Sequence, residues 1–344
     1  MKTLEIHGST RDSRILVGES IRNVKKYIPD KKLMIITDSN VRELYGKDFP
    51  DAPVMEIGLG EGIKNLETVS DIFAHLVENE ADRSAFILGI GGGIVCDISG
   101  FAASTYLRGV RFAFVSTTLL SQVDASVGGK NGVNYSGYKN MVGVFRQPEW
   151  VICDTDMLRT LPQKEILCGF AEIVKHAAIA DADMFSWLEK NREKALALDK
   201  NALEKMVYDS VLIKSGIVNR DEKEKGERRK LNFGHTFGHA VEKVAKIPHG
   251  EAVSIGMVVA AALSVRKGYL KAADAERIEN LLANLNLPTR MEMDKNRVTD
   301  ALKRDKKREG DSIHFVLLRS IGEAVVEEIR IRQLEDVINE LCQS

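Results

Sequence analysis

Three histidines gather in a short part of this 344-residue chain and are the first candidates for chemistry. Residues 231–242 read LNFGHTFGHAVE, which contains His235 and His239, and His249 follows in IPHGE; the whole chain has only seven histidines. Because His235 and His239 lie four residues apart, they share one face of a helix. Imidazole nitrogens are common ligands of zinc and related metals. The cluster therefore predicts a metal site.

The pattern differs from that of a metal-dependent hydrolase. In the HExxH pattern of zinc proteases, a glutamate after the first histidine acts as the general base, but residue 236 here is a threonine. A carboxylate is still expected among the ligands. Glu172 is the candidate, because it lies in the apolar helical stretch AEIVKH (171–176), where a buried charge needs a partner. Two histidines, one carboxylate and open positions are typical of a catalytic metal.

A glycine-rich segment suggests nucleotide binding. LGIGGGIVCD (88–97) places three glycines directly after an apolar run, where a backbone can approach a ligand and a helix N-terminus can hold a phosphate. The segment departs from G-x-G-x-x-G, since Ile94 takes the place of the third glycine. These residues alone fit a nucleotide site and a plain tight turn equally well. Asp38 in TDSNV, and Glu61 and Lys64 in GEGIKN, are candidates for the same site.

Polar and charged stretches supply further candidates. STTLLSQVDASVGGKNGVNYSGYKNMVG (116–143) is long for a connection in a compact domain, which predicts a binding loop, although a solvated loop has a similar composition. Its Gly-Gly-Lys unit resembles a flexible anion grip. The runs NRDEKEKGERRK (219–230) and DKKREG (305–310) are expected to be solvated faces. The first run abuts the histidine cluster, so Glu224, Arg228 and Asn232 are candidates to line the metal site.

The elements that must position these residues differ between the two parts of the chain. Up to residue 155, short β-rich runs (32–38, 85–93, 111–118 and 150–154) alternate with helical spacing, as at 66–77 with Asn65 as N-cap. This alternation predicts a parallel sheet covered on both faces. Later, helical patterns dominate at 164–180, 200–219, 236–246, 250–267 and 273–286, and 312–318 with 322–329 predicts a hairpin.

The composition excludes several classes of protein. A formal net charge of −1 gives no overall attraction to nucleic acid or membrane. Cys96, Cys153, Cys168 and Cys342 form no CxxC pair, so neither a disulfide framework nor a thiolate zinc site is expected. The first residues have no apolar signal segment, and the most apolar stretch, 252–265, is too short to span a bilayer. We expect a soluble, cytoplasmic protein.

Seven motifs occur in a fixed order along the chain. They read GGGIVCDISGFAASTYLRG, STTLLSQVDASVGGKNGVN, YKNMVG, GFAEIVKHAAI, DEKEKGERRKLNFGHTFGHAVE, PHGEAVSIGM and DKK. One such motif is weak evidence, but seven in order resemble the 3-dehydroquinate synthase family, of the sugar phosphate cyclase superfamily, over about 31–320. The resemblance implies an α/β N-terminal Rossmann-like nucleotide-binding domain (1–156), followed by a mainly α-helical metal-binding domain (157–344). It also implies an active site between the domains, a homodimer, NAD, and a zinc or cobalt ion.

The resemblance also implies roles for individual residues. The metal ligands are Glu172, His235 and His249, while His239 and Glu224 act as acid–base groups. Substrate-contacting positions are Asp124, Lys130, Asn140, Lys175, Lys214, Arg228, Asn232 and Lys306 of the DKK turn, and Arg108 reaches the phosphate bound by the neighbouring subunit. Cofactor positions are Asp38, Asn40, Glu61, Lys64, Gly92, Gly93, Asp97, Thr117, Thr118, Lys130, Lys139, Met157, Leu158, Arg159 and Thr160. Cys96, Asn131 and Ser116 depart from the usual Gly, Thr and Pro of the family.

The implied reaction converts 3-deoxy-D-arabino-heptulosonate 7-phosphate to 3-dehydroquinate and phosphate, in the shikimate pathway toward aromatic amino acids. NAD would act catalytically, through transient oxidation at C5, β-elimination of phosphate, re-reduction and aldol closure. Two alternatives share the architecture: another cyclase, acting on sedoheptulose 7-phosphate or glucose 6-phosphate, and a metal-dependent polyol or glycerol-phosphate dehydrogenase. Glu224, Asn232, His239 and the DKK lysine favour the first reading. A non-enzymatic binding module fits least, since many reactive groups converge.

Overall fold

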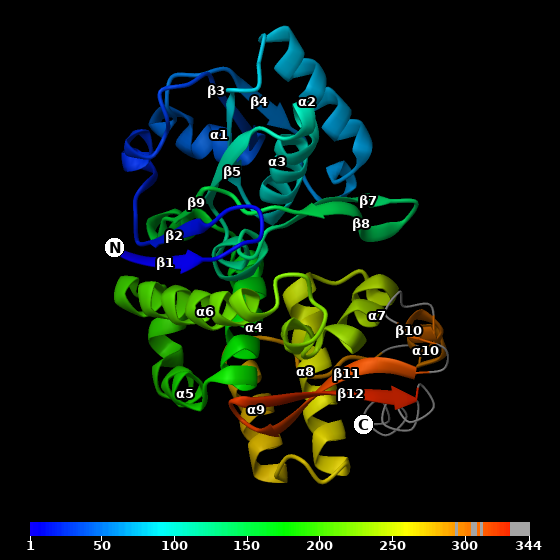
Figure 1. Cartoon of the computed structure of the whole chain (residues 1–344). Helices are drawn as coiled ribbons and strands as arrows, with labels where there is room; N and C mark the ends of the chain where they lie inside the picture. The colour runs from blue at the N-terminus through cyan, green and yellow to red at the C-terminus, as the bar shows by residue number, and fades with distance from the viewer. Residues whose placement is uncertain (293–294, 304–307, 310–311, 331–344) are drawn as a thin grey trace. The chain divides into compact units, whose positions relative to one another are not determined.

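The fold is taken from a computed structural model, which describes residues 1–292, 295–303, 308–309 and 312–330 (Figure 1). The chain forms two compact units: residues 1–161 with 203–223, and residues 162–202 with the chain from 224 onward. The domain bounds expected from the sequence, 1–156 and 157–344, stay a prediction. Within the described ranges, no helix is both long enough and apolar enough to cross a membrane.

The first unit is built on a seven-stranded sheet with the order β1-β2-β9-β6-β5-β3-β4. The strands are β1 (Lys2–Ile6), β2 (Ser13–Val17), β3 (Leu33–Asp38), β4 (Val54–Ile57), β5 (Phe86–Gly91), β6 (Arg111–Ser116) and β9 (Trp150–Cys153). Neighbouring strands are parallel except β1 and β2. β3, β5 and β6 are apolar and buried along almost their whole length, as a sheet covered on both faces requires. The predicted strands are confirmed to within two residues at each end.

Helices connect these strands, and the chain changes its direction along the sheet once between β3 and β6. They are α1 (Ser39–Tyr45), α2 (Leu66–Glu78) and α3 (Gly93–Thr105). The predicted N-cap of α2 is confirmed, because Asn65 Oδ1 accepts a hydrogen bond from the Thr68 N–H at 2.9 Å. From β3 the chain moves outward to the edge strand β4, whereas from β5 it moves in the other direction to β6. The carboxyl ends of β3 and β5 therefore flank a switch point, where open α/β sheets bind ligands.

The polar stretch 116–143 is mostly regular structure, so the expectation of a loop was wrong, while its role in binding stays a prediction. It forms a π-helical turn, η5 (Ser121–Ala125), and an antiparallel hairpin of β7 (Lys130–Tyr135) and β8 (Tyr138–Phe145). Ser136 and Gly137 make the hairpin turn with φ of 49° and 78°, and Gly132 lies opposite Gly143 across the strands. Glycines, which loops favour, here allow a tight turn and a close strand pair.

The second unit is mainly helical. Its elements are α4 (Gln163–Ala180), α5 (Ala182–Leu196), α7 (His235–Ala245), α8 (His249–Arg266), α9 (Ala272–Asn284), α10 (Lys295–Lys303) and a sheet of β10 (Arg308–Glu309), β11 (Ser312–Ser320) and β12 (Glu323–Arg330). Helix α6 (Lys200–Arg220) belongs mostly to the first unit, from residue 203 onward. The predicted helices and the β11–β12 hairpin are confirmed. In the second unit α8 packs against both α4 and α7 (Figure 1).

Short helical turns complete the two units. They are η1 (Ile21–Lys26), η2 (Gly46–Asp48), η3 (Glu61–Ile63), η4 (Tyr106–Arg108), η6 (Thr155–Thr160) and η7 (Glu227–Asn232). Four of them, η3, η4, η6 and η7, contain residues that the sequence marks as candidates for the site.

Candidate active site

Glycines let three helices of the second unit approach one another closely. A Cβ on Gly256 of α8 would lie 1.9 Å from the carbonyl oxygen of Gly234, which precedes α7. A Cβ on Gly250, also in α8, would lie 2.3 Å from the Cα of Cys168 in α4. Gly234 has φ of +77°, a left-handed conformation that glycine adopts without strain. These contacts bring the first residues of α7 and α8 against the middle of α4.

Glu172 of α4, His235 of α7 and His249 of α8 come together at this junction. Their ligand atoms all lie within 4.8 Å of one another, and Glu172 Oε1 is 3.4 Å from Nε2 of each histidine. Glu172 is fully buried, and its Oε1 accepts no hydrogen bond from the residues that the structure describes. A buried carboxylate oxygen in this position is unfavourable unless a cation lies beside it. The three side chains therefore fit a divalent metal such as zinc or cobalt.

Hydrogen bonds orient the three side chains. His235 Nδ1 lies 3.1 Å from the Phe233 carbonyl oxygen, and His249 Nδ1 lies 3.3 Å from Glu242 Oε2. Acceptors at both Nδ1 atoms place the proton there and leave the Nε2 lone pairs for a metal. Lys175, one turn beyond Glu172 in α4, donates a hydrogen bond to Glu172 Oε2. Glu172 thus presents one oxygen, Oε1, to the histidines.

Neighbouring charges set the protonation of this cluster. Burial raises the pKa of Glu172, but Lys175 and His235 lower it more, so this pKa lies well below its usual value. Burial lowers the pKa of His249, but its contacts with Glu172 and Glu242 raise it further, to about 9. The carboxylate is therefore ionised, and His249 must release a proton when a metal binds.

His239 lies beside the three ligand candidates, one turn along α7 from His235. Its ring centroid is 5.3 Å from that of His235 and 6.1 Å from that of His249. His239, Glu242 and His249 form a second possible ligand group. The first group is favoured, because Glu172 Oε1 is buried without a hydrogen bond from the described residues, whereas Glu242 Oε2 already contacts His249 Nδ1.

The charged run 219–230 is only partly a solvated face. Arg228, in η7, is 2% exposed, so the expectation of a solvated face is wrong at this residue. Asn232 Nδ2 donates a hydrogen bond to Glu224 Oε1 at 2.6 Å, and Glu224 has φ of 57°. Glu224, Arg228 and Asn232 therefore lie in one hydrogen-bonded, partly buried segment that leads directly into α7. Lys306 lies outside the described residues.

In the first unit, glycines open the N-terminus of α3. Gly92 is the N-cap and Gly93 the first residue of this helix, directly after β5. A Cβ on Gly92 would lie 2.9 Å from Thr118 Cγ2, and a Cβ on Gly93 would lie 2.9 Å from the Cβ of Ala125. The two glycines therefore let Thr118 and Ala125 pack closely against the start of α3. The N–H groups of this helix N-terminus suit a phosphate of a nucleotide.

A hydrogen-bond network lies beside this helix in the same unit. Lys64, which is 6% exposed, donates to Asp97 Oδ2 and, at 2.6 Å, to Asn140 Oδ1. Burial raises the pKa of Asp97, although the Lys64 ammonium lowers it in part. Asn134 Oδ1 accepts from the Asn140 N–H at 2.8 Å, and Asn134 Nδ2 donates to Glu61 Oε1 at 2.8 Å. Asn134 was not predicted, because nothing in its sequence context distinguishes it from a turn residue.

Other predicted residues lie around the carboxyl edge of the sheet. Asp38 ends β3 and accepts a hydrogen bond from the Val41 N–H at 2.9 Å, and Lys214 of α6 donates to Asp124 Oδ1 at 2.6 Å. The remaining predicted positions are Asn40 in α1, Thr117 and Thr118 after β6, Lys130 in β7, Lys139 in β8, and Met157, Leu158, Arg159 and Thr160 in η6. Arg108 stands apart from these, in the exposed turn η4.

The three departures from the family pattern are all buried. Cys96 is fully buried in α3, and burial raises the pKa of its thiol, so a reactive thiolate is disfavoured. Asn131 Nδ2 donates to the carbonyl oxygens of Gly129 and Arg146, at 3.1 and 2.8 Å, and so fastens the Gly-Gly-Lys turn to the end of β8. The Ser116 carbonyl oxygen accepts from Gln122 Nε2 at 3.0 Å, a backbone contact that does not depend on the serine side chain.

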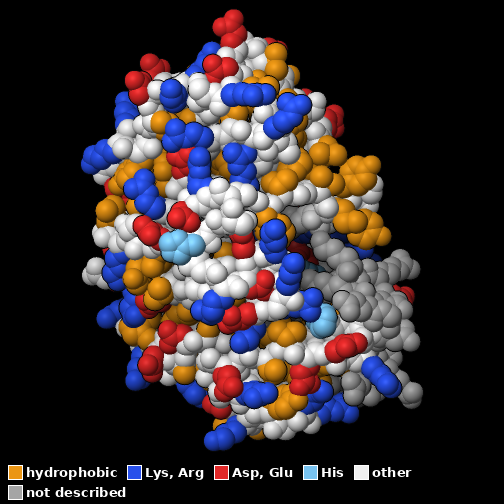
Figure 2. Space-filling view, viewed as in Figure 1, with side chains coloured by type: hydrophobic (Ala, Val, Ile, Leu, Met, Phe, Trp, Pro, Cys, Tyr) orange, Lys and Arg blue, Asp and Glu red, His pale blue; other side chains and the backbone are white. Residues whose placement is uncertain are grey.

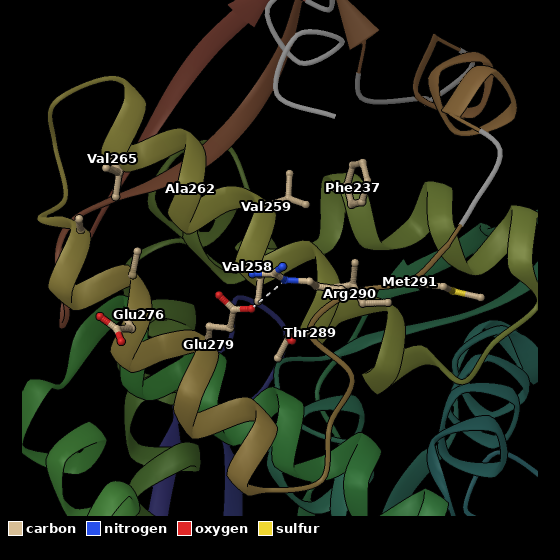
Figure 3. Close-up of a pocket in the computed structure, with 13 residues that line it drawn as sticks. Phe237, Val258, Val259, Ala262, Val265, Glu276, Glu279, Thr289, Arg290 and Met291 are labelled. Carbon is tan, nitrogen blue, oxygen red and sulfur yellow. Dashed lines mark hydrogen bonds and ion pairs between the residues drawn. The ribbon is translucent and has the colours of Figure 1, made fainter. Parts of the chain in front are cut away.

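A pocket of about 330 Å³ lies elsewhere in the second unit, between α7, α8 and α9 (Figure 3). Phe237, Val258 and Val259 contribute apolar side chains to it, and Arg290 Nε donates to Glu279 Oε1 at 3.2 Å within it. Among the described lining residues, none is a predicted site residue. Its mainly apolar lining does not suit a sugar phosphate, so we do not assign it to the active site.

Comparisons with known proteins agree with this arrangement. The family model described as 3-dehydroquinate synthase N-terminal matches residues 54–168, and the model described as 3-dehydroquinate synthase C-terminal matches residues 169–308. The 3-dehydroquinate synthase of Dehalococcoides mccartyi is 40% identical to this chain over 344 aligned positions, which cover 95% of this chain and 96% of that relative.

Two solved structures are similar over nearly the whole chain. A 2-deoxy-scyllo-inosose synthase complexed with carbaglucose-6-phosphate, NAD+ and Co2+ is 27% identical, with a TM-score of 0.87 over 98% of this chain and 100% of that chain. A 2-epi-5-epi-valiolone synthase from Streptomyces hygroscopicus subsp. jinggangensis, with NAD+ and Zn2+ bound, is 27% identical, with a TM-score of 0.88 over 100% of this chain and 99% of that chain. Since the family models match both the glycine-rich start of α3 and the helices that carry Glu172, His235 and His249, the chain belongs to the 3-dehydroquinate synthase family.

Proposed function

We propose that the protein converts 3-deoxy-D-arabino-heptulosonate 7-phosphate to 3-dehydroquinate and phosphate, with NAD and a zinc or cobalt ion as cofactors. Relatives named 3-dehydroquinate synthase, at 40% identity over most of the chain, support the reaction. The observation that carries the proposal is the convergence of His235 and His249 on the buried, unbonded Oε1 of Glu172. The N-terminus of α3, which begins with two glycines directly after β5, supports NAD binding.

The proposed chemistry divides between the bound groups and the side chains. When bound, NAD supplies a hydride acceptor and donor, and the metal supplies a Lewis acid that lowers the pKa of a coordinated hydroxyl. The His239 imidazole and the Glu224 carboxylate would move protons. The Asn232 amide donates a hydrogen bond to Glu224 Oε1, which supports a fixed position for this carboxylate. The buried Arg228 guanidinium can grip an oxyanion with two parallel hydrogen bonds. The enzyme would be a carbon–oxygen lyase that eliminates phosphate.

A second candidate is another sugar-phosphate cyclase. The two solved relatives are cyclases with different names, and each is 27% identical to this chain. The higher identity to 3-dehydroquinate synthases favours the acidic sugar as substrate. A polyol dehydrogenase would differ from both cyclases, since it releases NADH in proportion to product.

Phosphate release from 3-deoxy-D-arabino-heptulosonate 7-phosphate tests the proposal. With NAD and zinc or cobalt present, we expect turnover without net NADH. Removal of the metal by a chelator should lower the rate at least about a hundredfold, and added metal should restore it. Sedoheptulose 7-phosphate and glucose 6-phosphate serve as control substrates. Preferred release from either control, or no release from the acidic sugar, would contradict the proposal.

We also propose a homodimer in which Arg108 reaches the phosphate bound by the partner subunit. Leu107 and Arg108 form an exposed turn with φ of 48° and 69°. On the β7–β8 hairpin, Tyr135, Tyr138 and Met141 are 54%, 49% and 53% exposed. Figure 2 shows hydrophobic side chains gathered where this hairpin lies. Exposed apolar clusters of this kind are typical of an interface, which supports association of two copies.

Mixing two inactive variants would test the shared site. Arg108→Ala and His235→Ala should each be nearly inactive alone. If the subunits exchange, half of the dimers are mixed, and one of their two sites has both residues intact. Activity of about a quarter of the wild-type value is therefore expected from an equal mixture. A monomeric mass by light scattering would contradict the dimer, and no recovery after exchange would contradict the shared site.

We propose that the protein acts in the cytoplasm and has no nucleic-acid partner. Cys96, Cys153 and Cys168 are buried free thiols, as expected in a reducing compartment; Cys342 lies outside the described residues. Figure 2 shows Lys and Arg interspersed with Asp and Glu over the lower half of the view. The formal net charge of −1 gives no overall attraction to nucleic acid.

A further inference from the structure

Glu242 lies on the same face of α7 as the two histidines of that helix. It follows His235 by seven residues and His239 by three, a spacing that aligns side chains along a helix. Its side chain is 13% exposed, and its Oε2 lies 3.3 Å from His249 Nδ1. We propose that Glu242 is a positioning residue, which fixes the tautomer and ring orientation of His249 for metal binding. The inference rests on the metal-dependent function proposed above.

The two histidine ligands have different partners at Nδ1. His235 Nδ1 faces the carbonyl oxygen of Phe233, two residues away in its own segment. His249 is the first residue of α8, and its Nδ1 faces a carboxylate that belongs to α7. His249 lies at the positive end of the α8 dipole, which makes its imidazole nitrogen a weaker ligand for a cation. A carboxylate at Nδ1 opposes this effect and raises the basicity of Nε2.

A direct ligand role for Glu242 fits the geometry less well. In the second possible ligand group, His239, Glu242 and His249 would hold the ion together. Glu242 Oε2 faces Nδ1 of His249, so a metal between them would require His249 to coordinate through Nδ1. Glu172 Oε1 would then keep its buried position without a hydrogen bond from the described residues and without a cation. If Glu242 instead positions His249, one ion beside Glu172 Oε1 gives that carboxylate a partner, while Glu242 keeps His249 Nδ1 as its own partner.

Metal binding by three variants tests the role. Glu242→Gln keeps an acceptor oxygen but loses the charge, and Glu242→Leu removes both. Glu251→Gln, in the first turn of α8, is the matched control, because it removes the same charge two residues from His249. We would measure dissociation constants for zinc and cobalt by chelator competition, the visible absorption of the cobalt-loaded protein, and the Tm of the metal-free protein.

We expect Glu242→Gln to weaken metal binding about tenfold and Glu242→Leu up to about a hundredfold. The cobalt absorption should shift in both, while the metal-free Tm stays near that of the wild type. Glu251→Gln should bind metal as the wild type does. Unchanged affinity in the Glu242 variants overturns the proposal. So does complete loss of stoichiometric binding in Glu242→Gln, which would make Glu242 a ligand.

Two further results have distinct meanings. A weakened affinity with an unchanged cobalt spectrum and a lowered metal-free Tm would show a structural role only, and would also overturn the proposal. Failure of the wild-type protein to bind either metal would instead contradict the proposed function. The wild-type titration therefore separates the failure of the two hypotheses.

Discussion

Glu172→Ala is expected to lose stoichiometric metal and, in the metal-free state, about 3–5 kcal/mol of folding stability. Glu172 and Lys175 are both buried, with side chains 0% and 1% exposed, and form an ion pair within α4. Removal of the carboxylate leaves the ammonium of Lys175 buried without this partner, which is strongly unfavourable. It also removes the anionic ligand candidate of the cluster. Urea unfolding of the metal-free protein and elemental analysis measure the two effects.

The double variant Glu172→Ala/Lys175→Met separates these effects. Replacement of a buried ion pair by apolar side chains is often close to neutral, so most of the lost stability should return. Metal binding should not return, because the carboxylate is still absent. A double variant as unstable as Glu172→Ala would show that the pair does not explain the loss. Stoichiometric metal in either variant would contradict the assignment of Glu172 as a ligand.

The fold could be predicted from the sequence wherever burial dictates residue spacing. Strand β5 is apolar and buried throughout, and α2 carries its apolar residues at helical spacing. The prediction failed at 116–143, because Gly132 and Gly143, which suggested a loop, pair across the β7–β8 hairpin. Helix α5 was also missed, since charged residues separate its few buried side chains, such as Phe185 and Leu188.

The candidate site was predictable in its residue types but not in its contacts. Spacing indicates that His235 and His239 share a helix face, yet it does not show which of them faces Glu172. That distinction depends on how closely α4, α7 and α8 approach, which Gly250 and Gly256 make possible. Such contacts join residues far apart in the chain, where periodicity carries no information.

The spacing of Glu242 in the sequence already indicates that it faces the histidine cluster. Glu242 is the last residue of the stretch LNFGHTFGHAVE. It follows His239 by three residues and therefore lies on the same face of α7. Its partner, His249, belongs to the next helix, so the pairing itself appears only in the structure. Asn134 has no comparable signal, because its partners Asn140 and Glu61 lie in a different strand and in η3.

His239→Asn is expected to keep the metal but to lower kcat by about 10²–10⁴-fold, the range for loss of an acid–base group. His235→Asn is the matched control, because it makes the same substitution one turn away on the same helix. The control should lose both metal and activity, since His235 Nε2 faces Glu172 Oε1 at 3.4 Å. Elemental analysis and phosphate release, measured on both variants, give the comparison.

The opposite result would relocate the metal within the same cluster. If His239→Asn lost the metal while His235→Asn kept it, the ion would lie in the group of His239, Glu242 and His249. Glu172 Oε1 would then need another explanation for its buried position, for which Lys175 does not suffice, because Lys175 bonds the other oxygen, Oε2. Since His249 belongs to both groups, a variant at His249 does not distinguish them. The contrast between His235 and His239 therefore decides which side of His249 holds the metal.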